Sequence, residues 1–280
     1  MSAIIIDGKA MAETEKAHWH RQILGVPSPL GIREIKLRPT LAILSFGGDP
    51  ASEVYIRNKM KACRDVGVSC LTANLPKDAI TRGIGVLKQW AADAMVDGII
   101  VQLPAPEWKQ LIKLIPPEKD VDGLRSDSRF DPCTPKGVVK MLKSVTSLEG
   151  KKAVIVGRSE IVGKPLAKML LNENCTVTVC HSKTQNLREE TSSADILVSA
   201  VGSPGLITAD MVKDGAVVID VGINRIDGKL TGDVDFEAVK EKASHITPVP
   251  GGVGPMTVAM LIENVCQANH RTLSQLNQSI

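Results

Sequence analysis

The chain has 280 residues, a mass of 30.0 kDa and a formal net charge of +3, with 43% hydrophobic and 23% charged residues. This size suits two medium domains or one large domain. The charge is too small to indicate nucleic-acid binding, and no lysine- and arginine-rich block with interleaved aromatic residues is present. We find neither a secretory signal nor an apolar run long enough to span a bilayer. These features predict a cytoplasmic protein without nucleic-acid or membrane partners.

The cysteines and histidines favour neither a disulfide framework nor a metal site. The six cysteines are scattered, without a Cys-x-x-Cys pair, which predicts reduced thiols. The five histidines show no i, i+4 spacing that would place two imidazoles on one helical face. We therefore expect no metal.

Apolar segments alternate with helical patterns along most of the chain, which predicts βα units and mostly parallel sheets, an α/β fold. In the first half, the expected strands are residues 4–6, 41–46, 70–75 and 97–104, and the expected helices are residues 10–24, 51–66 and 80–94. Residues 25–39 are rich in proline and polar groups and predict a loop, and residues 116–123 predict a second, rigid and charged loop.

The second half begins a new βαβ series after an expected domain joint at residues 132–137. A helix is expected to about residue 143 and over 166–171, with strands at 153–156, 176–179, 195–200 and 216–221. We therefore predict two domains around a cleft. Residues 1–130 form an N-terminal catalytic domain onto which the C-terminal helix 255–280 packs, and residues 131–254 form a Rossmann-like domain.

The stretch Thr247–Thr257 holds three prolines and three glycines in eleven residues. Proline fixes φ and lacks a donor, whereas glycine permits positive φ, so the stretch predicts a loop of one defined shape instead of a helix or a paired strand. Pro255 suits the first position of a following helix. A rigid turn before a terminal helix is the simpler interpretation, and a ligand-binding loop is the alternative.

A strand, a glycine turn and a helix surround Gly157 and Gly163, which is the context of a dinucleotide-binding site. Ser159 stands where the middle glycine of that motif usually lies. The next strand ends in Ser182 and Lys183, with no acidic residue to hold the ribose hydroxyls of NAD. Together with Arg158, these groups favour the 2′-phosphate of NADP. Two further glycines end the next two strands and either line the cofactor groove or form ordinary turns: Gly202 and Gly222.

Tyr55 and Lys59 lie one helical turn apart on the same face of a predicted helix. The same spacing marks short-chain dehydrogenases, but there the glycine motif precedes the pair, and here it follows. Taken alone, the pair is more simply an ordinary helix face.

Six segments in this order change that interpretation: Tyr55-x-x-x-Lys59, residues 101–104 (Val-Gln-Leu-Pro), 119–123 (Lys-Asp-Val-Asp-Gly), 132–135 (Pro-Cys-Thr-Pro), 157–163 (Gly-Arg-Ser-x-x-Val-Gly) and 248–257. Together they resemble the methylenetetrahydrofolate dehydrogenase/methenyltetrahydrofolate cyclohydrolase family over essentially the whole chain. The resemblance implies NADP as cofactor, one-carbon derivatives of tetrahydrofolate as substrates, a place in purine biosynthesis, and a homodimer formed through the Rossmann-like domains.

The resemblance also implies roles for individual residues. Lys59 matches the catalytic lysine, Tyr55 the ring that packs on folate, Gln102 the amide that hydrogen-bonds the lysine, and Asp122 the carboxylate that binds the amino edge of the pterin. The further implied substrate contacts are Val101, Leu103, Pro248, Val249, Pro250, Gly251 and Gly252. The implied cofactor contacts are Gly157, Arg158, Ser159, Ser182 and Ile223.

The chemistry of the family suits these residue types. Hydride transfer needs the two reactants held face to face, whereas hydrolysis of the methenyl cation needs an activated water, from which a neutral lysine could take a proton. Arg57, Lys61 and Arg64 either favour the neutral lysine, attract the anionic glutamate tail of folate, or form a solvated basic face.

Two segments are shorter than in the family: residues 124–131 and the stretch after Pro104. Both lie at the expected cleft, so its geometry could differ. Because Lys59, Gln102 and Asp122 are all present, we expect both activities. The alternatives are a dehydrogenase that has lost the hydrolysis step and a non-catalytic folate- or nucleotide-binding protein.

Overall fold

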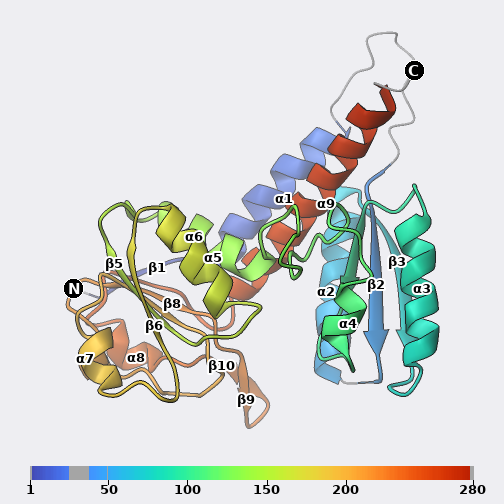
Figure 1. Ribbon diagram of the computed structural model, residues 1–280. Helices are drawn as coiled ribbons and strands as arrows, with labels where there is room; N and C mark the ends of the chain where they lie inside the picture. The colour runs from blue at the N-terminus through green and yellow to red at the C-terminus, as the bar shows by residue number, and fades with distance from the viewer. Residues whose placement is uncertain (1, 25–37, 49, 278–280) are drawn as a thin grey trace. The chain divides into compact units, whose positions relative to one another are not determined.

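The computed structural model describes residues 2–24, 38–48 and 50–277 (Figure 1). The chain forms two compact units, which we name by their sheets. The six-stranded unit comprises Met1–Ala12 and Thr134–Thr257, and the three-stranded unit comprises Glu13–Cys133 and Val258–Ile280. Two long helices, α1 (Gly8–Leu24) and α9 (Val253–Asn277), contribute residues to both units.

The three-stranded unit is built on a parallel sheet with the order β3-β2-β4. Its strands are β2 (Thr40–Phe46), β3 (Ser69–Leu75) and β4 (Gly98–Val101), and its helices are α2 (Pro50–Val66), α3 (Ile80–Ala92) and α4 (Trp108–Ile112). The central strand β2 is buried over most of its length, as a parallel strand covered on both faces should be. On one face, Ala42, Leu44 and Phe46 join a core with side chains of α3 and α4.

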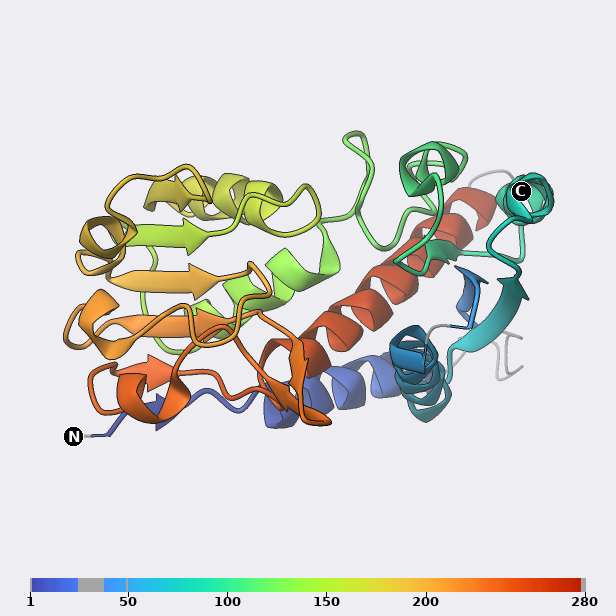
Figure 2. The ribbon, with the colours of Figure 1, turned by 90° about the horizontal axis from the view of Figure 1, so that it is seen from below.

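Within the described residues, six parallel strands form the sheet of the other unit, in the order β1-β11-β8-β7-β5-β6 (Figure 2). The strands are β1 (Ile4–Ile5), β5 (Lys152–Val156), β6 (Thr176–Cys180), β7 (Ile196–Ser199), β8 (Val217–Asp220) and β11 (His245–Ile246). The remaining elements are α5 (Cys133–Lys143), α6 (Gly163–Asn172), α7 (Leu187–Thr191), the 3-10 helix Ala209–Met211, α8 (Phe236–Val239) and an antiparallel hairpin of β9 (Asn224–Ile226) and β10 (Lys229–Thr231).

The strand order of the six-stranded sheet defines where a ligand should bind. The chain passes from β5 to β6 on one side and then returns to β7 on the other side of β5. The strand order therefore reverses between β5 and β7, and the crevice outside their carboxyl ends is the expected ligand site of an open α/β sheet. The predicted α/β fold with a Rossmann-like domain is confirmed.

The structure corrects the predicted elements at several points. Strand β4 ends at Val101 and not at Pro104, and the short helices α4, α7 and α8 were not predicted. Residues 1–12 belong to the six-stranded unit and not to the first domain, because β1 pairs with β11. Strand β11 and the β9–β10 hairpin were not predicted, since strands of two or three residues carry almost no periodic signal. Helix α9 begins at Val253, so residues 253–257 are helical and Pro255 is the third helical residue, still within the first turn where proline is tolerated.

Most of the loop predicted at residues 25–39 lies outside the described residues. No helix in the described part of the chain is both long and apolar enough to cross a membrane.

Candidate active site

Lys59 and Gln102 form a direct hydrogen bond in the three-stranded unit. Lys59 lies on α2, and Gln102 directly follows the carboxyl end of β4. The Lys59 Nζ donates to Gln102 Oε1 at 3.0 Å, while Gln102 Nε2 donates to the Leu103 carbonyl at 2.8 Å. The backbone N–H of Gln102 donates to the Leu44 carbonyl at 2.8 Å. Both ends of the amide are thus engaged, and its oxygen accepts from the Lys59 Nζ.

The face of α2 that carries Lys59 also carries Tyr55, one turn earlier, and both side chains are half-buried. Arg57, Lys61 and Arg64 are exposed. This exposure agrees with a solvated basic face, and the other two interpretations of these cations stay predictions.

Val101 and Leu103 flank Gln102 but differ in what they can offer a ligand. Val101 is 2% exposed and belongs to the core of its unit, so only its main chain is available. Leu103 is half-buried, and the Leu103–Pro104 peptide bond is cis.

The loop that carries Asp122 is held by its backbone and by a buried neighbour. The carbonyl of Asp122 accepts from the Cys133 N–H at 3.4 Å, and its side chain is half-buried. Gly123 has φ +71°, and a Cβ there would lie 2.6 Å from Pro132 N, so no other residue fits this turn without a shift. From α9, the Asn264 side chain donates to the carbonyls of Val121 and Asp131 at 2.9 and 3.2 Å.

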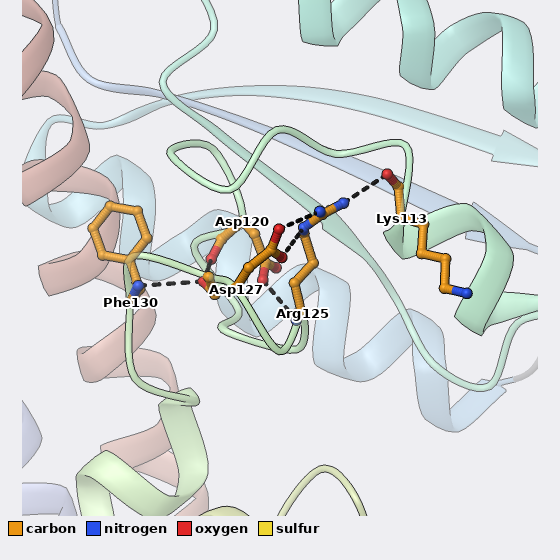
Figure 3. Close-up of polar contacts among 6 residues, drawn as sticks. Lys113, Asp120, Arg125, Asp127 and Phe130 are labelled. Atoms are coloured by element: carbon orange, nitrogen blue, oxygen red, sulfur yellow. Dashed lines mark hydrogen bonds and ion pairs between the residues drawn. The ribbon is translucent and has the colours of Figure 1, made fainter.

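Two sets of contacts hold the segment 124–131: the Arg125 guanidinium, whose contacts we call the arginine clasp, and hydrogen bonds to Asp120 (Figure 3). The guanidinium of Arg125 donates two hydrogen bonds of 2.7 Å to the Asp127 carboxylate and one of 2.6 Å to the Lys113 carbonyl. The backbone N–H of Arg125 donates to Asp120 Oδ2 at 2.9 Å. Burial raises the pKa of Asp120, which is 1% exposed and two residues before Asp122. The segment thus has a defined conformation.

The turn after β5 requires glycine at two positions, because a side chain at either one would collide with a backbone carbonyl oxygen. Gly157 has φ +129°, and a Cβ there would lie 2.5 Å from the Ala200 carbonyl oxygen, at the end of β7. A Cβ on Gly163 would lie 2.1 Å from the carbonyl oxygen of Gly157. The Ser159 hydroxyl accepts from the N–H groups of Val162 and Gly163 at the start of α6. Helix N-termini of this kind bind phosphate groups.

The other candidate cofactor residues follow neighbouring strands of the same sheet. Arg158, Ser182 and Ile223 are exposed and lie beyond the carboxyl ends of β5, β6 and β8. Lys183 is also exposed, and residues 180–183 contain no acidic side chain. A glycine turn, a helix N-terminus and cationic or hydroxyl groups at the next strand end therefore fit a dinucleotide with a 2′-phosphate.

The loop Pro248–Gly252 is fixed at both ends within the six-stranded unit. Before it, the Thr247 hydroxyl accepts from the Asp220 N–H at 2.8 Å, and the Thr247 N–H donates to the Val218 carbonyl at 3.1 Å. Inside it, the Gly251 carbonyl accepts from the Lys9 N–H at 2.9 Å, and the Val249–Pro250 peptide bond is cis. A Cβ on Gly252 would lie 2.6 Å from the Pro248 carbonyl oxygen, so this glycine cannot be replaced without moving the loop.

The structure thus divides the predicted site residues into two groups, one in each unit. The three-stranded unit holds Tyr55, Lys59, Val101, Gln102, Leu103 and Asp122, and the six-stranded unit holds Gly157, Arg158, Ser159, Ser182, Ile223 and residues 248–252. Two buried carboxylates at the same sheet edge, Asp220 and Asp233, are not among the predicted site residues. The available signal was an acidic residue, followed by Val221, near the end of the predicted strand 216–221, and a second one after Gly232. Within the described residues, no group of three His, Cys, Asp or Glu side chains is placed to hold a metal ion.

Comparison with known proteins agrees with this arrangement. Residues 6–122 match the family description "Tetrahydrofolate dehydrogenase/cyclohydrolase, catalytic domain", and residues 132–273 match its "NAD(P)-binding domain". The chain is 47% identical to "Bifunctional protein FolD" of Halalkalibacterium halodurans, over 96% of this chain and 99% of that protein.

Two solved structures resemble the chain at its full extent. The FolD methylenetetrahydrofolate dehydrogenase/cyclohydrolase of Campylobacter jejuni is 40% identical, covering 96% of this chain and 99% of its own, with a TM-score of 0.90. The dehydrogenase-cyclohydrolase of Trypanosoma brucei, solved with NADP cofactor and an inhibitor, is 33% identical, covering 98% and 99%, with a TM-score of 0.90. With both halves matched and nearly half of its residues shared with a full-length relative, this chain belongs to the tetrahydrofolate dehydrogenase/cyclohydrolase family.

Proposed function

We propose that this protein oxidises 5,10-methylenetetrahydrofolate with NADP and hydrolyses the resulting 5,10-methenyltetrahydrofolate to 10-formyltetrahydrofolate. The observation that carries the proposal is the 3.0 Å hydrogen bond between Lys59 and Gln102, in a chain that matches both domains of the family.

The six-stranded unit supplies the cofactor site. NADP, when bound, supplies the acceptor for the hydride that leaves the methylene bridge. Gly157 and Ser159 shape the turn that would receive the pyrophosphate at the N-terminus of α6, and Ile223 would offer its backbone. Arg158 and Ser182 would bind the 2′-phosphate through charge-assisted and hydroxyl hydrogen bonds. The contribution of the chain to this step is position, since the hydride needs no acid or base.

The three-stranded unit supplies the hydrolytic group. Lys59 takes a proton from the water that attacks the methenyl carbon, and the Gln102 oxygen holds its amine in place. The bond from this carbon to N5 then breaks, N5 takes the remaining hydroxyl proton, and Lys59 releases its proton to solvent. Tyr55 packs its ring on the pterin, and Asp122 binds the amino edge of the pterin. The backbone of Val101, the side chain of Leu103 and the loop of Pro248, Val249, Pro250, Gly251 and Gly252 complete the folate contacts.

One assay tests both reactions. The purified chain is mixed with 5,10-methylenetetrahydrofolate and either NADP or NAD, and the absorbance of the reduced cofactor and of the methenyl product is followed. We expect both to appear with NADP, followed by decay of the methenyl signal. If the methenyl product decays only at its uncatalysed rate, the proposed hydrolysis is contradicted, and the result indicates a monofunctional dehydrogenase. Binding of both ligands without turnover indicates a non-catalytic protein.

The proposal extends to the setting of the enzyme. The scattered free cysteines agree with a cytoplasmic location, and the formyl product serves purine biosynthesis. The chain is proposed to form a homodimer through its six-stranded unit, which light scattering of the purified protein tests.

A further inference from the structure

Two carboxylates are buried at the carboxyl edge of the six-stranded sheet, and none of the roles above uses them. Asp220 ends β8 and is 4% exposed, and Asp233 follows β10 and is fully buried. Buried carboxylates are costly unless every oxygen is hydrogen-bonded, so their partners show what they hold in place.

Asp233 binds the segment that follows β7. Its Oδ2 accepts from the Ser199 hydroxyl at 3.0 Å and from the N–H groups of Val201 and Gly202 at 2.9 and 3.2 Å. Its Oδ1 accepts from the Ser203 N–H at 2.8 Å. A single carboxylate thus organises three consecutive backbone N–H groups in an exposed segment without regular secondary structure.

The same carboxylate also binds the segment that follows β8. Its Oδ1 accepts from Asn224 Nδ2 at 3.1 Å, directly beside Ile223. A Cβ on Gly222 would lie 2.2 Å from this oxygen, so the glycine lets the backbone approach the carboxylate. Asp233 therefore connects the segment 201–203 to Asn224, the neighbour of the proposed cofactor residue Ile223, and lies directly against Gly222.

Asp220 in turn fixes Asp233. Its oxygens accept from the backbone N–H groups of Gly222, Asp233 and Val234 at 2.9 to 3.0 Å. A Cβ on Gly232 would lie 1.9 Å from Asp220 Oδ2. Asp233 thus packs against Gly222, which lies beside Asp220 in the sequence, and Asp220 packs against Gly232, which precedes Asp233. These contacts fix the position of the two segments relative to each other.

This network lies at the point where a dinucleotide is expected. The segment held by Asp233 begins beside Ala200, whose carbonyl leaves no room for a side chain on Gly157. The carboxyl ends of the neighbouring strands β5 and β7 lie there, where the strand order reverses. Val201 and Ile223 expose 40% and 47% of their surface next to the anchored backbone. We propose that Asp233 is a positioning residue for NADP, which fixes the backbone after β7 and β8 against which the cofactor binds.

The proposal rests on the proposed function, and the two activities provide a way to test it. Replacing Asp233 by asparagine keeps the volume but turns one accepting oxygen into a donor that faces backbone N–H groups. The segment after β7 or Asn224 then loses its anchor. We expect the full-length Asp233→Asn protein to bind NADP about 10- to 100-fold more weakly by titration calorimetry, as loss of one to two hydrogen bonds to a charged group implies. Its hydrolysis of supplied methenyltetrahydrofolate, which consumes no NADP, should stay within about twofold of wild type.

Asp195→Asn is the matched control, because it makes the same exchange at the other end of β7. Asp195 precedes this strand, accepts from the Lys152 N–H at 2.9 Å and pairs with Lys213. Its variant should bind NADP as wild type does. If Asp233→Asn does not fold, Ser199→Ala removes only one donor to the carboxylate and should weaken NADP binding about three- to tenfold.

The outcomes separate this inference from the proposed function. Unchanged NADP affinity in a folded Asp233→Asn or Ser199→Ala protein overturns the positioning role. So does an equal fall in NADP binding and hydrolysis together with a lower melting temperature, which indicates a purely structural role. A wild-type protein that binds no NADP overturns the proposed function itself.

Discussion

The two units of this protein solve different chemical tasks with different parts of the polypeptide. In the three-stranded unit, the candidate site rests on a side-chain contact, in which the Lys59 amine donates to the Gln102 amide. In the six-stranded unit it rests on backbone shape, set by Gly157, Gly163 and the buried carboxylate of Asp233. Hydrolysis needs a functional group, whereas binding a dinucleotide needs N–H groups and close approach of the backbone.

Mutations should therefore act differently in the two units. In the three-stranded unit, a substitution should abolish a reaction by deleting an atom that takes part in it. In the six-stranded unit, substitutions should act by adding atoms where none fit or by releasing a backbone segment. A substitution in the three-stranded unit should therefore impair hydrolysis first, and one in the six-stranded unit should impair NADP binding first.

Lys59→Met should give the largest effect. Deleting the amine removes the proposed base and should lower the rate of methenyltetrahydrofolate hydrolysis by about 10²- to 10⁴-fold, while much of the NADP-dependent oxidation remains. Separate assays of the two steps measure this. The exposed Lys88 on α3 gives the control Lys88→Met, expected to behave as wild type. Equal loss of both activities would contradict the role assigned to Lys59.

Gly163→Ala should damage the other unit by overpacking. The added Cβ would lie 2.1 Å from the Gly157 carbonyl oxygen, so the turn or α6 must move, at a cost of about 3 kcal/mol in the free energy of unfolding. NADP binding should weaken more than hydrolysis does. In the control Gly85→Ala, the new Cβ meets nothing within 4 Å on helix α3, and stability should rise by about 0.5–1 kcal/mol. A Gly163→Ala protein as stable as wild type would refute the steric argument.

The contrast between the units also explains what the sequence could and could not predict. Lys59, Gln102 and Asp122 were found because each stands in a short motif, and the sequence spacing alone placed Tyr55 on the face of Lys59. The hydrogen bond to Gln102 could be expected only from the family resemblance, because it joins residues 43 positions apart.

The carboxylate network was not predictable for a physical reason. Asp233 acts on the backbone of residues about 30 positions earlier, and backbone N–H groups are the same at every position of a sequence. Similarly, β1 was assigned to the wrong unit because its partner β11 is only two residues long and lies at the other end of the chain. Glycine positions were the visible sign of close packing, but the sequence does not tell which atoms lie against them.

The pH dependence of stability tests the buried carboxylates directly. Burial, and secondarily the charge of Asp233, raises the pKa of Asp220 from 3.8 to about 6, although three backbone N–H groups oppose the shift. Because the folded-state pKa exceeds the unfolded one, the folded protein binds more protons between pH 4 and 6. The free energy of unfolding should therefore fall by about 2–3 kcal/mol from this group as pH rises through that window. Denaturant unfolding at several pH values measures it.

Asp220→Asn isolates this contribution. Burial also raises the pKa of Asp97 and Asp120 in the three-stranded unit, so these two groups also lower the wild-type free energy of unfolding as the pH rises. The asparagine variant keeps both of these contributions and lacks only the ionisation of residue 220. Its loss of stability between pH 4 and 6 should be smaller than that of wild type by about 2–3 kcal/mol. Parallel curves for the two proteins would show that the pKa of Asp220 is the same in the folded and unfolded states.

The smallest effect is expected at the segment 124–131 of the three-stranded unit. Arg125→Ala removes the guanidinium that joins Asp127 to the Lys113 carbonyl, and so loosens the segment after Asp122 (Figure 3). Because Asp120 still accepts from the backbone N–H of residue 125, the loop should keep its course. We expect the KM for methylenetetrahydrofolate to rise about two- to fivefold with kcat unchanged, as for a loss of ground-state and transition-state binding alike.

The same segment offers a control for that experiment. Arg129 is exposed, and its backbone N–H donates to the Pro117 carbonyl, a bond that Arg129→Ala retains. A rise in KM confined to Arg125→Ala would show that the clasp, and not the charge of the segment, holds Asp122 for the folate. An equal rise in both variants would indicate long-range attraction of an anionic substrate, which added salt should abolish. A fall in kcat at Arg125→Ala would show that the three-stranded unit also depends on backbone shape, and would narrow the contrast between the two units.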